Sequence, residues 1–143
     1  MKIGFLTDKN GYRAPIHPES IEKYSLDVHL EKDIFEYLKY SESIQNNVKT
    51  ISKVSDLDIV ACVENIEDKK IKDLKEGAIL IGIFDFEKIE DIKNLRPDIK
   101  ILSFFKLPRI SRAQNLDALS SQANLLGYAS VLRAAKELSL IHI

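Results

Sequence analysis

The stretch LDIVACVENIEDKKIKDLKEGAILIGIF, residues 57–84, decides the fold. It begins with the near-continuous apolar run Leu57–Val63, which is typical of a buried strand in a parallel sheet. Residues with helical spacing follow over Ile66–Leu74, and Gly77 stands where a helix commonly ends. A second apolar run, Ala78–Phe84, comes next. The stretch therefore predicts one strand–helix–strand unit whose two strands are parallel.

The same alternation continues on both sides of this unit. An amphipathic helix is predicted over Glu87–Leu95 and a strand over Ile99–Lys106. On the N-terminal side, short apolar runs predict three strands, over Lys2–Leu6, Asp27–Glu31 and Val48–Ser52. A segment that begins with a proline predicts a helix over Pro18–Tyr24. We expect an α/β fold, flavodoxin- or Rossmann-like, with a mainly parallel sheet, helices on both faces and a long final helix from about Leu116.

Length and composition exclude several classes of protein. The 143 residues suffice for one domain with its own core, and the net charge of -1 argues against a nucleic-acid binder, which needs a basic surplus. With Cys62 as the single cysteine, an intrachain disulfide is impossible and a cysteine metal site is not expected. No run approaches the roughly 20 apolar residues of a membrane span, so we expect no membrane insertion of this chain and a cytoplasmic location. The charged run Glu64–Lys75 is expected to form a solvated helix face.

Polar side chains gather in residues 107–128, LPRISRAQNLDALSSQANLLGY. This stretch follows a predicted strand, at the edge where open parallel sheets keep their ligand crevices. Two interpretations stay open. The stretch is a ligand site, or it is capping chemistry, with Asn115 as the cap of the next helix, Asp117 in its first turn, and Arg109 and Arg112 as solvated surface.

The helix that follows carries small residues on one face. Ala123, Gly127, Ser130 and Ala134 are spaced four, three and four apart, and such a stripe lets another backbone approach closely. We expect a buried helix that packs tightly within its own domain. The alternative is a helix that links two domains and has part of its packing partner elsewhere.

Residues Pro108–Tyr128 closely resemble the signature loop of the α subunit of proton-translocating NAD(P) transhydrogenases. The family pattern is Pro-Arg-Ile-Ser-Arg-Ala-Gln, one variable residue, Leu-Asp-Ala-Leu-Ser-Ser, then Ala-Asn and Gly-Tyr, and this chain matches it with fixed spacing. The N-terminal half resembles the alanine dehydrogenase/transhydrogenase N-terminal domain more faintly, through Gly11–Pro18. Arg13 resembles an arginine of that segment, although a surface arginine is the other interpretation, and His17 is expected at the surface.

The resemblance implies an enzyme subunit that transfers a hydride between NAD(H), bound to this subunit, and NADP(H), bound to a membrane β subunit, coupled to proton translocation. Arg109, Gln114 and Asp117 match the family loop that closes over the nicotinamide and are the implied catalytic residues. Ser120 and Tyr128 match further cofactor-binding positions near that nucleotide. The family also implies a homodimer of the α subunit, a peripheral place at the inner membrane through partner subunits, and no metal.

One departure from the wider family bears on the function. Alanine dehydrogenases carry a lysine and a histidine for their substrate after two of the strands, and this chain reads Ala61–Asn65 and Ile83–Phe86 there. An alanine-dehydrogenase-like oxidoreductase is therefore the weaker alternative, and a stand-alone, non-catalytic binding module is a further one.

No Gly-x-Gly-x-x-Gly turn, which a dinucleotide pyrophosphate needs, occurs in the sequence. In the family that fingerprint lies in a downstream domain. We therefore expect residues 1–137 to be the N-terminal domain of an incomplete subunit that is inactive alone. We expect residues 138–143 to be a non-native tail encoded by a sequencing adapter, with a genuine short apolar C-terminus as the alternative.

Overall fold

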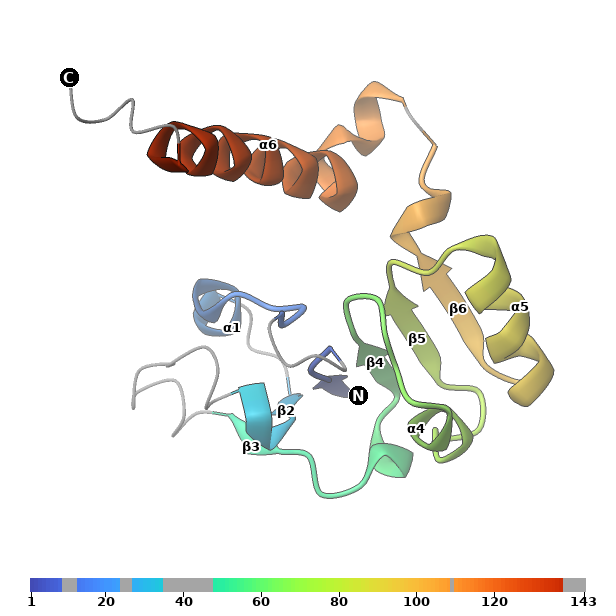
Figure 1. Ribbon diagram of the computed structural model, residues 1–143. Coiled ribbons are helices and arrows are strands. Elements are labelled where there is room, and N and C mark those ends of the chain that lie inside the picture. Colours follow the sequence, from blue (N-terminus) through green and yellow to red (C-terminus); the bar gives the residue numbers. More distant parts are fainter. Residues whose placement is uncertain (9–12, 24–26, 35–47, 109, 138–143) are drawn as a thin grey trace. The chain divides into compact units, whose positions relative to one another are not determined.

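The computed structural model describes residues 1–8, 13–23, 27–34, 48–108 and 110–137. These belong to two compact units, Met1–Ser103 and Phe104–Ile143. We call them the sheet unit and the helical unit. In Figure 1 the sheet unit runs from blue to light orange, and the helical unit from orange to red.

The sheet unit is built on six parallel strands in the order β3-β2-β1-β4-β5-β6. Their bounds are Lys2–Phe5 (β1), Asp27–Leu30 (β2), Lys49–Thr50 (β3), Ile59–Ala61 (β4), Ile79–Gly82 (β5) and Lys100–Ser103 (β6). The strands predicted from residues 57–84 are β4 and β5, which pair in parallel with Ile59 beside Ile79. The predicted parallel sheet is confirmed.

Helices cover both faces of this sheet. They are α1 (Pro18–Lys23), α4 (Asp68–Lys72) and α5 (Phe86–Leu95). Gly4 pairs with both His29 and Val60, so Val60 lies on one face while Val28, next to His29, lies on the other. The buried apolar residues of α4 and α5 pack in one cluster with Val60, and α1 packs against the cluster that contains Val28. The expectation of helices on both faces is confirmed.

Local chemistry explains the start of α5 and the turn after α4. The Asp85 carboxylate caps α5 by accepting a hydrogen bond from the backbone N–H of Lys88 at 2.8 Å. Gly77 is expected at the end of the helix after β4, but α4 ends at Lys72 with Asp73 as its C-cap. Gly77 lies in the turn before β5, where its φ of 69° is a left-handed conformation that glycine adopts without strain. Helix α4 is shorter than the predicted Ile66–Leu74, although both of those end residues are buried in the core.

The helical unit contains two 3-10 turns and one long helix. They are η2 (Phe104–Lys106), η3 (Ser111–Leu116) and α6 (Ala118–Glu137). Strand β6 ends at Ser103, so the last three residues of the predicted strand form η2 instead, closed by the backbone N–H of Leu107 donating to the carbonyl of Phe104 at 3.3 Å. The predicted loop before the helix is largely ordered as η3.

Helix α6 is the predicted long helix, and it is exposed along nearly its whole length. All four residues of the small stripe are exposed, and within its own unit α6 contacts η2. The expectation of a tightly packed, buried helix is therefore not met within the helical unit. Among the described residues, no helix is both long and apolar enough to cross a membrane.

Candidate functional site

A hollow in the helical unit is formed by the turns before α6 and by the first turn of that helix. Its volume is about 620 Å³, which is in the range of pockets for small molecules. Apolar and polar side chains share its lining: Phe104, Phe105, Leu107, Pro108, Ile110, Ala113, Ser111, Gln114, Asp117 and Ser120. The hollow therefore offers flat apolar surface together with a small set of hydrogen-bonding groups.

Asp117 is fixed by the start of α6. Its Oδ1 accepts a hydrogen bond from the backbone N–H of Ser120 at 3.0 Å, and its Oδ2 accepts one from the Ser120 hydroxyl at 2.6 Å. A side chain that bonds the N–H three residues ahead is an N-cap, so the cap is Asp117. The expectation that Asn115 caps the helix is wrong, because Asn115 lies inside η3 and α6 starts only at Ala118.

Three of the five predicted site residues converge on this hollow. Gln114, Asp117 and Ser120 all line it. The backbone N–H of Asp117 donates to the carbonyl of Gln114 at 3.1 Å, which joins η3 to the cap of α6. The Gln114 side chain is exposed and makes no hydrogen bond with any described residue, so its amide can both donate and accept toward a ligand.

Of the other two predicted residues, only Tyr128 is described by the structure. Arg109 lies outside the described residues. Tyr128 is exposed on α6, eight residues beyond Ser120, which corresponds to about 12 Å along a helix. It does not line the hollow.

The sequence was compared with known proteins, and no family model matches it. The chain is 35% identical over 139 residues to NAD(P) transhydrogenase subunit alpha of Haemophilus influenzae, which covers 90% of this chain and 27% of that protein. It is 34% identical over 152 residues to the first part of NAD(P) transhydrogenase subunit alpha of Rickettsia prowazekii, which covers 94% of this chain and 40% of that protein. The chain is a homologue of NAD(P) transhydrogenase α subunits.

Solved structures support the same relationship. The crystal structure of transhydrogenase from Sinorhizobium meliloti matches with a TM-score of 0.82 and 26% identity, over 96% of this chain and 45% of that chain. An L-alanine dehydrogenase matches with a TM-score of 0.61 over 78% of this chain and 35% of that chain, but at 14% identity it shows a shared fold alone. This transhydrogenase homologue spans between about a quarter and two fifths of the length of the two curated relatives.

A second polar cluster of this transhydrogenase homologue lies in the sheet unit, after β1 and β4. The Nη1 and Nη2 atoms of Arg13 donate to the two carboxylate oxygens of Glu64 at 3.1 and 2.8 Å. Nη2 also donates to Oδ2 of Asp8 at 2.8 Å, and Oδ1 of Asp8 accepts from the backbone N–H of Asn65 at 3.0 Å. Hydrogen bonds to Glu64 and then to Asp8 raise the pKa of Arg13 above its ordinary value. Arg13 is therefore a charged group held by two carboxylates.

Sequence reasoning singles out Arg13 but misses both of its partners. The charge pattern predicts Glu64 on a solvated helix face, whereas the structure places it before α4, bonded to Arg13. Asp8 is buried, with 3% of its surface exposed. An acidic residue shortly after each of two predicted parallel strands is the available signal, because such strand ends share one edge of the sheet. His17 is exposed, as expected.

The described residues offer neither a reactive thiol nor a metal cluster. Burial, and then the charge of Asp8, raises the pKa of the Cys62 thiol to about 12, so this cysteine is a core residue with little thiolate at neutral pH. Among the described residues, no group of three or more metal-ligating side chains comes together.

Proposed function

We propose that this chain is the N-terminal part of the NAD(H)-side subunit of a proton-translocating NAD(P) transhydrogenase. In the complete enzyme, a hydride passes between NAD(H) on this subunit and NADP(H) on the β partner, coupled to proton movement across the membrane. Support comes from the homologous α subunits and from the loop of residues 107–128, whose polar residues surround the hollow before α6. The convergence of Gln114, Asp117 and Ser120 on that hollow carries the proposal.

The residues of the hollow fit a nicotinamide. Phe104, Phe105 and Ile110 supply apolar surface for a flat ring, and the Gln114 amide matches the donor and acceptor of a carboxamide. When bound, the nicotinamide supplies the carbon that gives or takes the hydride. No protein nucleophile is needed for that transfer. The protein holds the two reacting atoms about 3–3.5 Å apart in the correct orientation and excludes water from them.

The individual residues have distinct roles in this proposal. Gln114 orients the carboxamide, and the Asp117 carboxylate accepts a hydrogen bond from it. Ser120 fixes the Asp117 carboxylate, so that it does not have to reorganise when the nucleotide binds. Arg109 closes over the ring, and Tyr128 acts farther along α6.

Other parts of the enzyme complete the nucleotide site. The sequence holds no glycine-rich pyrophosphate turn, so the pyrophosphate is bound by a domain outside this chain. The proposed assembly is a homodimer of α subunits at the cytoplasmic side of the inner membrane, attached through the β subunit. No metal takes part.

The test measures two quantities, the rate of hydride transfer in the complete enzyme and the melting temperature of this chain. Asp117→Asn keeps an N-cap, since asparagine and aspartate cap equally well, so the melting temperature should barely change. The transfer rate should fall roughly tenfold or more, because one charged contact to the nicotinamide is worth at least about 1.4 kcal/mol. Arg109→Ala should likewise reduce the rate without unfolding the chain.

Asp91→Asn, the same chemical change on the exposed face of α5, is the matched control and should leave both quantities unchanged. A loss of rate that only parallels a loss of melting temperature would show that Asp117 and Arg109 are structural and would overturn the assigned roles.

A further inference from the structure

The strand order of the sheet unit reverses between β1 and β4 (Figure 1). From β1 the chain builds the sheet outward through β2 and β3, and it then returns to build β4, β5 and β6 on the other side. The segments that leave the carboxyl ends of β1 and β4 therefore diverge. In open parallel sheets, the crevice between two such segments is where ligands bind.

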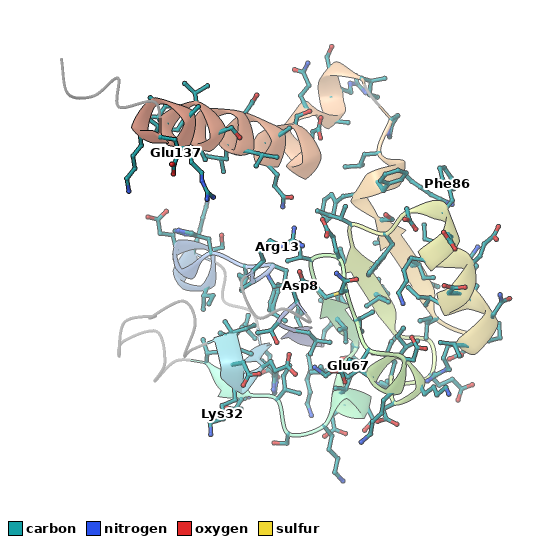
Figure 2. All side chains as sticks on the ribbon, viewed as in Figure 1. Asp8, Arg13, Lys32, Glu67, Phe86 and Glu137 are labelled. Carbon is teal, nitrogen blue, oxygen red and sulfur yellow. The ribbon has the colours of Figure 1, made fainter. Side chains whose placement is uncertain are left out.

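A single arginine with two carboxylates fills this position in the sheet unit. Asp8 and Arg13, which Figure 2 labels side by side, come from the segment after β1, and Glu64 comes from the segment after β4. Glu64 meets the guanidinium with both oxygens. A two-pronged pairing of this kind is also the way in which arginine binds the carboxylate of a small ligand.

The two carboxylates are held very differently. Asp8 is 3% exposed and is bonded to Arg13 and to the backbone N–H of Asn65, so it belongs to the fixed structure. The Glu64 side chain is 39% exposed, and among the described residues its carboxylate is held by Arg13 alone. Glu64 is therefore the displaceable member, and the 39% exposure of the Arg13 side chain leaves the guanidinium open to solvent.

The net charge of the Arg13, Asp8 and Glu64 cluster opposes the binding of a free anion to Arg13. One guanidinium and two carboxylates sum to a charge of about -1, so an incoming carboxylate meets repulsion as well as competition for the same two nitrogen atoms. Without the Glu64 charge the cluster is neutral, and two guanidinium N–H groups lose their acceptor. A carboxylate forms stronger, charge-assisted hydrogen bonds with a guanidinium than water or a neutral amide does, so a ligand that supplies a carboxylate is bound.

We propose that Glu64 is an internal substitute for a ligand carboxylate. While it occupies Arg13, the guanidinium between the segments after β1 and β4 does not bind small organic acids. When Glu64 is removed, Arg13 binds them. Glu64 is thus a residue that determines specificity by exclusion, and this role does not depend on the function proposed for residues 107–128.

The experiment titrates the full chain with sodium acetate and follows the Nε–Hε signal of Arg13 by NMR, identified by its loss in Arg13→Lys. Sodium chloride replaces acetate at equal ionic strength in the reference titration. In Glu64→Gln, acetate should shift this signal saturably, with a dissociation constant roughly tenfold or more below that of the native chain. The double variant Glu64→Gln/Arg13→Lys should lose that affinity.

Glu67→Gln removes the same charge three residues away, at the exposed start of α4, and should behave as the native chain. Should Glu64→Gln fail to fold, Glu64→Asp keeps the charge but is one methylene shorter and so does not reach Arg13 as closely, and it should show intermediate acetate binding. Equal acetate affinity in the native chain and in Glu64→Gln would overturn the proposal. A folded Glu64→Gln or Glu64→Asp that does not respond to acetate would do the same.

Discussion

The sheet unit and the helical unit bury their apolar side chains to very different degrees. In the sheet unit, Leu80 and Ile92 are 0% exposed and pack in one cluster with buried residues of β4, α4 and α5. In the helical unit, Leu125 and Leu126 of α6 are 70% and 69% exposed. The sheet unit therefore carries its own core, whereas α6 has an apolar surface that its own unit does not cover.

Deleting a large side chain in each unit gives the largest expected contrast. Leu80→Ala removes buried methyl groups from the core and should lower the free energy of unfolding by roughly 2–5 kcal/mol. Leu125→Ala is the matched change on α6 and should shift it by less than about 0.5 kcal/mol, since the side chain is exposed and alanine is a good helix former. Urea unfolding of the full chain measures both. Equal losses would mean that α6 is buried in solution and that the two units do not differ in this way.

A glycine-to-alanine pair should give effects of opposite sign. A Cβ at Gly82 would lie 2.5 Å from the Phe84 ring and 3.0 Å from the carbonyl oxygen of Cys62, so Gly82→Ala should destabilise by roughly 1–3 kcal/mol. A Cβ at Gly127 would meet nothing within 4 Å, and Gly127→Ala should stabilise α6 by up to about 1 kcal/mol. The melting temperatures of the two variants test this. If Gly127→Ala destabilises, another backbone packs closely on α6.

The smallest effect concerns acid stability of the sheet unit. Burial by itself raises the pKa of Glu31, but hydrogen bonds from Lys70 and Thr7 outweigh it and lower the pKa below its ordinary value of 4.5. A lowered pKa means that the contribution to stability is complete above about pH 5 and is lost as the pH falls below the ordinary value.

Glu31→Gln should therefore flatten the loss of stability on acidification, by about 1 kcal/mol or less because the pair is partly exposed to solvent. Urea unfolding at a series of pH values measures this. Glu90→Gln, on the exposed side of α5, is the matched control and should keep the native pH profile. An unchanged profile in Glu31→Gln would show that the contact with Lys70 contributes nothing to folding.

Much of the fold could be predicted from residues 57–84, because a buried parallel strand, the helix after it and a second buried strand each depend on local sequence. The predicted helix end is too late in the chain, since α4 ends at Lys72 and Gly77 lies in the turn before β5. The boundaries were less predictable. The end of β6 at Ser103 and the cap at Asp117 depend on which backbone groups find partners, and several nearby residues have suitable chemistry.

For the candidate site, the loop motif named Gln114, Asp117 and Ser120, and the structure brings these three together because they lie within seven residues at the start of one helix. The partners of Arg13 could not be named in the same way. Glu64 lies 51 residues from Arg13 in the sequence, and no local pattern joins two residues across the strand reversal.

The sequence by itself determined the parallel α/β architecture, the polar loop before the last helix and the relationship to transhydrogenase α subunits, since each depends on residues that are close together in the chain. Only the tertiary structure decided that Asp8 and Glu64 occupy Arg13 and that α6 leaves its apolar side chains exposed within its own unit. The physical reason is the same in both cases. Burial and ion pairing depend on which distant segments meet, and that is fixed by the packing of the sheet.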